Sequence, residues 1–265
     1  MNYNESNKMA WEEAFDNRRD DWGEDIVAKI KNDGYPFLEK VLIDELSKFD
    51  FKGKTIAQFC CNNGRELLSI FKMGAEYGVG FDIAENMVSF ANITAMDLKM
   101  NCTFVATDIL DIDSTYHGTF DYIFITIGAL TWFNDLKVFF NKVASCLKDG
   151  GYLIINEMHP FTGMLAMEGE ENYDASIPNK LINSYFRQEP WVENNGMGYM
   201  SDSSMEYKKT FYSYSHTFAD IMNSIIDNGM QIRKLKEFES DISFSFCNLS
   251  DKGIPLSYIL ISQKR

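Results

Sequence analysis

The segment spanning residues 55–83 constrains the fold of this chain more than any other. It reads as an apolar strand, a turn at residues 60–64, a helix, and a second strand ending in Asp82. A strand–turn–helix–strand unit with an acidic residue about 20 positions past the turn is typical of domains that bind an adenosine-containing ligand. Free N–H groups at the helix N-terminus can contact the ligand, and the carboxylate can accept hydrogen bonds from both ribose hydroxyls. The turn nevertheless lacks the repeated glycines usual in such loops.

The composition restricts the class of protein. With 265 residues, 45% of them hydrophobic, the chain fits one large α/β domain or one domain with an insertion. A net charge of −14 argues against a nucleic-acid partner, which would need a basic surface. No apolar run reaches the roughly 18–20 residues of a membrane span. The five cysteines have no C-x-x-C spacing, and residues 1–21 are too polar for a signal peptide, so we expect a cytoplasmic protein with reduced thiols.

Strands and helices alternate along most of the chain. The predicted strands are residues 55–60, 77–81, 103–106, 120–126, 152–156, 231–238 and 257–262, and the predicted helices are residues 64–73, 85–99, 136–147 and 218–228. Short apolar strands alternating with helices indicate a parallel sheet covered on both faces. The glycines at positions 150 and 151 are expected to end the third helix as a C-cap.

Two regions stand apart from this alternation. Residues 1–50 are predicted to form an N-terminal helical cap, with Trp11 and Trp22 as its anchors and a helix opened by Pro36. Residues 51–265 form the main domain. Within it, residues 159–214 are weakly periodic and rich in Gly, Asn, Glu and Pro. We expect this stretch to be a lid-like insertion, with strands at 181–187 and 205–214 that pair as a hairpin.

Polar residues follow three successive predicted strands. Gly64 can adopt any backbone conformation, and Asn62 tolerates a positive φ, so a ligand-binding turn remains feasible. Asp82 closes the second strand and Asp108 follows the third, where a carboxylate could accept from an adenine amino group while Ile109 covers the ring. The alternatives are an ordinary strand-to-helix turn and helix N-caps. Together these positions match the rule that ligands bind at the carboxyl ends of parallel strands.

These segments resemble the class I S-adenosylmethionine-dependent methyltransferases, most closely over residues 52–160. The matching positions are residues 56–64 (motif I), Asp82 (motif II), Asp108 and Ile109 (motif III), residues 120–124 (motif IV) and the turn at 147–153. More narrowly, the chain resembles a poorly characterised bacterial small-molecule branch of this superfamily. The positions that carry this resemblance are Gln58, Cys60, Gly64, Arg65, Glu66, residues 128–132, Glu157, His159, Pro160, Phe161, Ser184, Tyr185, Phe186 and His216. The resemblance implies a Rossmann-like, doubly wound, seven-stranded and mostly parallel sheet with an antiparallel last strand.

The resemblance also implies S-adenosyl-L-methionine as the cofactor, and no metal is expected because the sequence offers no metal-ligand spacing. The implied cofactor-binding residues are Gln58, Phe59, Cys60, Asn62, Gly64, Asp82, Ile83, Met87, Asp108, Ile109, Thr126, Ile127 and Gly128. Gln58 stands where most members have an acid that helps hold the cofactor's ammonium group. A glutamine can accept that hydrogen bond, but without the charge that roughly doubles its strength. A non-catalytic binding module on the same fold therefore stays an alternative.

The implied reaction limits which residues catalysis needs. Methyl transfer is an in-line displacement, so a base is required only if the acceptor must lose a proton. His159 follows the fifth predicted strand beside Glu157, and His216 precedes the last predicted helix. We expect these three residues to be catalytic, with His159 as base or acceptor-orienting group. The alternatives are a loop-anchoring role for His159 and a capping or packing role for His216.

Aromatic residues are expected to line the acceptor pocket. The predicted substrate-binding residues are Trp11, Trp132, His159, Tyr185 and Trp191. Such a lining would suit a small aromatic or amine-bearing metabolite through stacking or cation–π contact. An NAD-dependent oxidoreductase is a further alternative. That class would require a glycine-rich turn and a catalytic Tyr-x-x-x-Lys motif or a comparable constellation, and the sequence shows neither. Cys60 and Cys61 are read as packing residues, and the chain is expected to be a monomer or homodimer.

Overall fold

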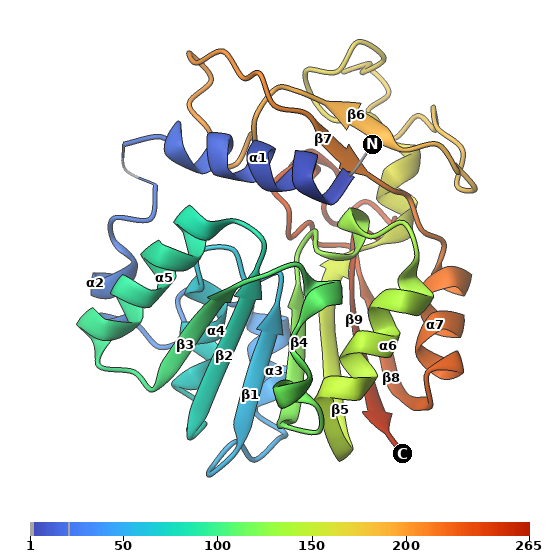
Figure 1. Ribbon diagram of the computed structural model, residues 1–265. Coiled ribbons are helices and arrows are strands. Elements are labelled where there is room, and N and C mark those ends of the chain that lie inside the picture. Colours follow the sequence, from blue (N-terminus) through green and yellow to red (C-terminus); the bar gives the residue numbers. More distant parts are fainter. Residues whose placement is uncertain (1–2, 21) are drawn as a thin grey trace.

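The computed structural model, which describes residues 3–20 and 22–265, joins seven strands in one sheet in the order β3-β2-β1-β4-β5-β9-β8 (Figure 1). The strands are β1 (Thr55–Phe59), β2 (Tyr77–Asp82), β3 (Cys102–Ala106), β4 (Phe120–Thr126), β5 (Leu147–Met158), β8 (Met230–Phe238) and β9 (Ser257–Lys264). Strands β1 to β5 are mutually parallel, and β9 runs antiparallel to both β5 and β8. The predicted Rossmann-like sheet with an antiparallel last strand is confirmed.

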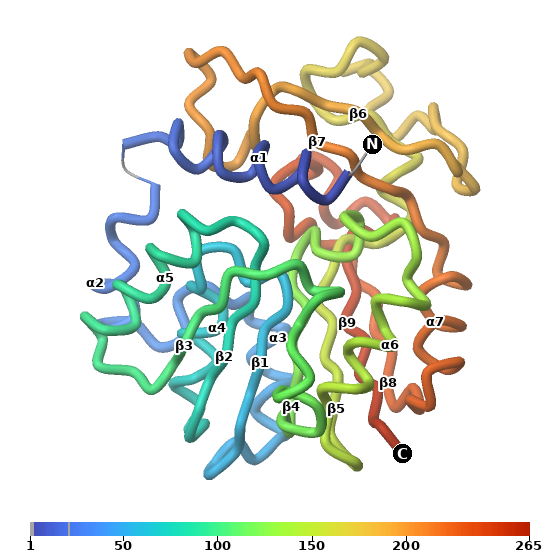
Figure 2. Tube along the Cα trace, viewed as in Figure 1, coloured from blue at the N-terminus to red at the C-terminus, as the bar shows by residue number. Residues whose placement is uncertain are grey.

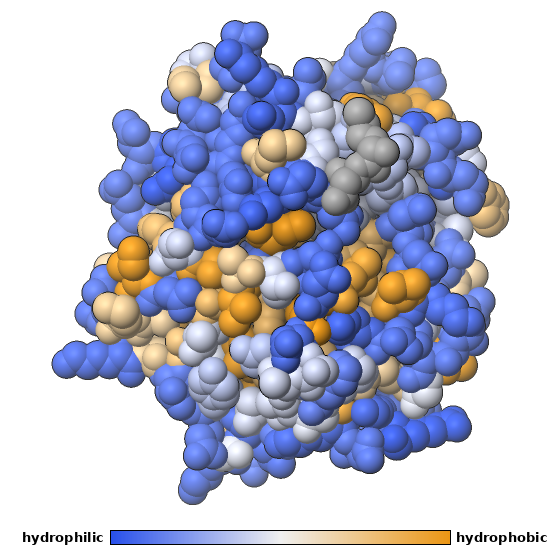
Figure 3. All heavy atoms as spheres, viewed as in Figure 1, coloured by the Kyte–Doolittle hydropathy of each residue, from blue (hydrophilic) through white to orange (hydrophobic). Residues whose placement is uncertain are grey.

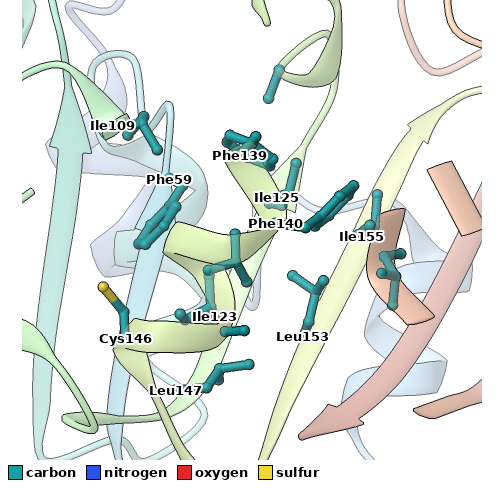
Figure 4. Close-up of a cluster of buried hydrophobic side chains, with 14 of the residues drawn as sticks. Phe59, Ile109, Ile123, Ile125, Phe139, Phe140, Cys146, Leu147, Leu153 and Ile155 are labelled. Atoms are coloured by element: carbon teal, nitrogen blue, oxygen red, sulfur yellow. The ribbon is translucent and has the colours of Figure 1, made fainter. Parts of the chain in front are cut away.

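Helices cover both faces of the sheet because successive side chains of each strand point to opposite faces. The helices are α1 (Tyr3–Asp16), α2 (Ile26–Asn32), α3 (Lys40–Leu46), α4 (Arg65–Phe71), α5 (Glu85–Leu98), α6 (Leu136–Cys146) and α7 (Phe218–Asp227). Ile56 packs with apolar residues of α2 to α5, whereas its neighbour Ala57 packs with those of α6 and α7. Figure 4 shows the second cluster, in which Ile123 and Ile125 of β4 meet Phe139 and Phe140 of α6.

The turn between α6 and β5 differs from its prediction. Residues 150 and 151 do not cap a helix, because α6 ends at Cys146 and Leu147 already pairs with Phe120 of β4. The glycines are needed for another reason. A Cβ atom at Gly151 would lie 2.9 Å from the carbonyl oxygen of Lys148 and 3.1 Å from that of Phe120. The chain therefore passes too close to its neighbours for a side chain.

A cap lies above the carboxyl ends of the parallel strands. Helix α1 crosses this edge beside β7 (Phe211–Ser213), which pairs antiparallel with β6 (Trp191–Glu193) (Figures 1 and 2). The side chain of Asn7 joins helix to strand, since it accepts from the backbone N–H of Tyr212 over 2.7 Å and donates to the Tyr212 carbonyl over 2.9 Å. In Figure 3 the outward surface around α1 is mainly hydrophilic.

The insertion contains a hairpin, but at different positions from those predicted. Residues 181–187 form no strand, because Ile182 donates its backbone N–H to Met164 in the turn that follows β5. Only Phe211–Ser213 of the second predicted strand is extended and paired. The predicted cap includes residues 1, 2 and 21, which lie outside the described residues, and the boundary at residue 50 stays a prediction. No helix within residues 3–20 and 22–265 is long and apolar enough to cross a membrane.

Candidate active site

The turn after β1 has the backbone of a glycine-rich loop without most of its glycines. Cys60 and Asn62 have φ of 56° and 52°, in the left-handed region that glycine usually occupies. Gly64, with φ of 79°, cannot be replaced as easily, since a Cβ there would lie 2.5 Å from the ring of Phe104. The missing glycines therefore do not prevent this chain from forming the loop.

Asp82 holds this turn from the end of β2. Its carboxylate accepts from the backbone N–H of Asn62 over 2.7 Å and from that of Ala84 over 3.1 Å. Burial raises the pKa of the Asp82 carboxyl, and these backbone hydrogen bonds oppose the rise. The residue thus links the first turn to the start of α5. This contact is compatible with the predicted ribose-binding role, because a carboxylate can accept more than two hydrogen bonds.

Asp108 lies at the neighbouring strand end and faces the cap. One carboxylate oxygen accepts from the backbone N–H of Leu110 over 2.9 Å, and the other from Nδ2 of Asn4 in α1 over 2.5 Å. A cavity of about 230 Å³ opens here between the cap and the ends of β2 and β3. It is lined by Asn4, Glu5, Lys8, Ile83, Glu85, Ala106, Thr107, Asp108 and Asp111. Asn4 was not among the predicted site residues.

Polar side chains without partners lie below the turn. Gln58 donates from Nε2 to Oγ1 of Thr126 over 2.7 Å, while its Oε1 is buried with no hydrogen-bond partner among the described residues. Both amide atoms of Asn63 are likewise buried and unpartnered within residues 3–20 and 22–265. Because an unpaired buried polar atom costs about 1–3 kcal/mol, this arrangement favours a polar ligand that completes it.

Glu157 fixes the loop that follows β4. Its carboxylate accepts from the backbone N–H groups of Gly128 (2.7 Å), Ala129 (2.6 Å), Leu130 (3.0 Å) and Met158 (3.1 Å). Burial raises the pKa of this carboxyl to about 7, against the opposing effect of these hydrogen bonds. All four contacts are to backbone, so the geometry favours a positioning role over direct proton transfer.

The two predicted catalytic histidines differ in their contacts. Nδ1 of His159 accepts from the backbone N–H of Phe161 over 3.0 Å, and Nε2 lies 2.9 Å from Oε1 of Glu237. Since both ring nitrogens are engaged, the loop-anchoring alternative is favoured over a general base. His216 has a buried Nε2 with no hydrogen-bond partner among the described residues. Burial lowers the pKa of both histidines, so the neutral form is favoured.

Three aromatic rings meet between the cap and the end of β4. Trp11 of α1 packs edge-on against Trp132 with ring centroids 5.3 Å apart, and Phe211 of β7 lies 5.3 Å from Trp11 and 5.7 Å from Trp132. We call Trp11, Trp132 and Phe211 the ring cluster. It joins two predicted substrate residues that are 121 positions apart in sequence, and adds Phe211, which the sequence did not single out.

Tyr185 and Trp191 make other contacts. The hydroxyl of Tyr185 accepts from the backbone N–H of Phe218 at the start of α7. Trp191 donates from Nε1 to Oγ of Ser215 over 3.0 Å, and the guanidinium of Arg187 covers its ring at 3.8 Å. These two residues therefore help to hold the insertion in place.

The remaining predicted residues have varied surroundings. Phe59 and Ile109 are fully packed in the core shared with α6, and Met87 packs beneath α1. Ile127 and Gly128 stay partly exposed beyond β4, and Gly128 has φ of 83°. Burial raises the pKa of the Cys60 thiol well above its usual value. No group of three or more His, Cys, Asp or Glu suited to a metal ion occurs in the part of the chain that the structure describes.

The sheet order, with its switch point between β1 and β4, and the polar strand ends define a Rossmann-like methyltransferase fold. Residues 50–211 match the family model described as a methyltransferase domain, and the chain belongs to that family. The prediction of a class I methyltransferase is confirmed.

Solved structures share this fold at low sequence identity. A Mesorhizobium loti S-adenosylmethionine-dependent methyltransferase is 17% identical, with a TM-score of 0.63 over 89% of this chain and 100% of that one. Geranyl diphosphate C-methyltransferase from Streptomyces coelicolor A3(2) is 12% identical, with a TM-score of 0.62 over 100% and 98%. A Clostridium acetobutylicum S-adenosylmethionine-dependent methyltransferase is 14% identical, with a TM-score of 0.60 over 91% and 95%. No curated protein matches the chain.

Proposed function

We propose that this protein transfers a methyl group from S-adenosylmethionine to a small aromatic or amine-bearing metabolite. Family membership supports methyl transfer. The class of acceptor is proposed from the ring cluster, in which Trp11 of the cap packs against Trp132 beyond β4. Indole faces bind planar rings by stacking and cations by cation–π attraction. The net charge of −14 also favours a cationic acceptor over an anionic one.

The residues at the strand ends fit the polar groups of this cofactor. The carboxylate of Asp82 suits the ribose hydroxyls, and that of Asp108 suits the adenine amino group. The buried, unpartnered Oε1 of Gln58 is an acceptor for an ammonium group. When bound, the cofactor supplies a methyl group activated by a positively charged sulfur.

The protein's own contribution is positioning. Glu157 fixes the loop that leads to Trp132, and α1 lies over the strand ends, where Asn4 contacts Asp108 (Figure 1). Holding the acceptor in line with the methyl group can contribute about 7–11 kcal/mol without a proton-transfer step. A mechanism without a proton-transfer step is consistent with the ring nitrogens of His159 and His216, which are hydrogen-bonded or buried.

Thermal unfolding with S-adenosylmethionine, S-adenosylhomocysteine and NAD tests the cofactor. We expect the first two to raise the Tm and NAD to leave it unchanged, and stabilisation by NAD alone would overturn the proposal. A transfer assay with a radiolabelled methyl group then compares aromatic amines, phenols, aliphatic amines and carboxylic acids as acceptors. Labelling of carboxylic acids only would exclude the proposed acceptor class. Cofactor binding without transfer to any acceptor would favour the non-catalytic module.

A further inference from the structure

Glu39 is a half-buried acid that the sequence did not mark as part of the site. It directly precedes α3, and its Oε2 accepts from Nδ2 of Asn156 in β5 over 3.1 Å. Burial raises the pKa of this carboxyl, with a further rise from Glu66 and an opposing effect of Arg65. Arg65 itself is paired with Glu66 at 2.8 Å. Among residues 3–20 and 22–265, Glu39 has no ion-pair partner of its own within 4.0 Å, so its partial burial costs free energy that a cation would offset.

A row of contacts connects Glu39 to Gln58 across three strands. Asn156 of β5 is the register partner of Thr126 in β4, so the two side chains lie side by side on one face of the sheet. Thr126 in turn accepts from Nε2 of Gln58 in β1 over 2.7 Å. These contacts bring the Glu39 carboxylate to the polar end of the face where the buried Oε1 of Gln58 has no partner.

We propose that Glu39 supplies the negative charge that Gln58 lacks, and that the two residues together hold the α-ammonium group of the cofactor. This inference rests on the proposed function. Gln58 stands at the motif I position where most class I methyltransferases carry an acid. An ammonium group placed between the two would satisfy the orphaned oxygen of Gln58 and compensate the half-buried charge of Glu39. In this chain the negative charge then comes from the residue directly before α3 and not from β1.

The test compares two ligands that differ only in the amine. Calorimetric titration measures the Kd of S-adenosylhomocysteine and of its deamino analogue, which lacks the α-amino group. The wild-type protein should bind S-adenosylhomocysteine about 10- to 100-fold more tightly, as expected of a charge-assisted hydrogen bond. Glu39→Gln, which keeps the shape and the acceptor for Asn156, should reduce this ratio to near one by weakening only the amine-bearing ligand. An unchanged ratio, including equal weakening of both ligands, would overturn the proposal.

Two further variants separate charge from structure. Gln58→Glu restores an acid to β1, and in the Glu39→Gln background it should recover most of the lost ratio. Glu45→Gln is the matched control, because Glu45 is a buried acid of α3, the helix that follows Glu39, and its partners are Lys48, Lys234 and Lys236. It should change the Tm and leave the ratio as in the wild type. A ratio that falls equally in the control would overturn the role of Glu39, whereas a wild-type protein that binds neither ligand would overturn the proposed function itself.

Discussion

The side-chain amide of Asn4 donates to the carboxylate of Asp108 over 2.5 Å, across 104 positions of sequence. This contact ties the first turn of α1 to the end of β3. Asp108 is also the acceptor predicted for the adenine amino group, and an amide NH₂ is the same kind of donor. The same helix carries Trp11 into the ring cluster. We therefore expect cofactor binding and closure of the acceptor side to be linked through α1.

We expect the Asn4 amide and the adenine amino group to compete for the Asp108 carboxylate, and removing the Asn4 amide tests this. Asn4→Ala should free the Asp108 carboxylate and strengthen the binding of S-adenosylhomocysteine by about 3- to 10-fold, the equivalent of one modest hydrogen bond. Titration calorimetry measures the Kd. The control is Lys8→Ala, which removes only the exposed ion pair with Glu85 and should change binding little. Weaker binding in Asn4→Ala would mean that the amide assists the cofactor instead of competing with it.

Asp82 is expected to be the strongest single determinant of ribose binding. Asp82→Asn keeps the size of the side chain but removes the charge that accepts hydroxyl hydrogen bonds. Affinity for S-adenosylhomocysteine should fall about 10- to 100-fold, and Asp82→Ala should abolish the ligand-induced rise in Tm. If Asp82→Ala binds the ligand normally, the ribose assignment is wrong.

His159 offers a clear distinction between catalysis and anchoring. Asparagine caps helical turns well, so His159→Asn should preserve the contact to Phe161, keep stability within about 1 kcal/mol and leave kcat nearly unchanged. His159→Ala should lose about 1–2 kcal/mol of stability. A fall of about 10²- to 10⁴-fold in the kcat of the asparagine variant would instead identify a general base.

Gly64 combines backbone strain with a steric clash. Gly64→Ala places a Cβ 2.5 Å from Phe104 at a φ of 79°, and we expect a loss of stability above about 2 kcal/mol. Gly229→Ala is the matched control, since its φ is 76° but nothing lies within 4 Å of the added atom. Its cost should be that of strain alone, about 1 kcal/mol. Denaturant unfolding measures both, and equal losses would argue against the clash with Phe104.

Glu157 should give the protein a recognisable dependence on pH. Its pKa is raised from 4.5 to about 7 in the folded state, which therefore binds the proton more tightly than the unfolded chain. Stability from this group is complete below about pH 4.5 and is lost as the pH rises through 7, by up to about 3 kcal/mol. The side chain in Glu157→Gln does not titrate, so this contribution to the pH dependence of stability is absent from the variant. Urea unfolding at pH 5 and pH 8 should show a larger fall for the wild type, and parallel pH profiles would contradict this expectation.

The sheet could be predicted from the sequence because its signals are local. Phe120–Thr126 is a continuous apolar run and forms a strand with the predicted bounds. The insertion was harder, because its short strands depend on distant partners. Phe211–Ser213 is extended where Asn7, more than 200 positions away, bonds to its backbone. Residues 181–187 follow the turn after β5 instead of pairing as a strand.

The candidate site could likewise be predicted from the sequence only in part. Sequence order alone places Asp82 and Asp108 at neighbouring strand ends, because parallel strands in this topology end at one edge. It could not show that the backbone N–H groups around Gly128 occupy the Glu157 carboxylate, or that Glu39 reaches Asn156 across 117 positions. Buried polar groups take whichever partner the folded chain brings within about 3 Å, and that choice depends on three-dimensional packing.

By itself, the sequence determined an α/β fold and the edge of the sheet that carries its polar residues, since apolar periodicity and the order of elements along the chain are local properties, and its motifs indicated a methyltransferase by resemblance. Only the tertiary structure decided how a turn with Gly64 as its one glycine forms, with Cys60 and Asn62 in left-handed conformations and Asp82 bonded to Asn62. It also brought Asn4 to Asp108, Glu39 to Asn156 and Phe211 to Trp11 and Trp132. These residues come from segments far from the motifs, and they reach the strand ends because the cap and α3 bury their apolar faces against the sheet and its edge.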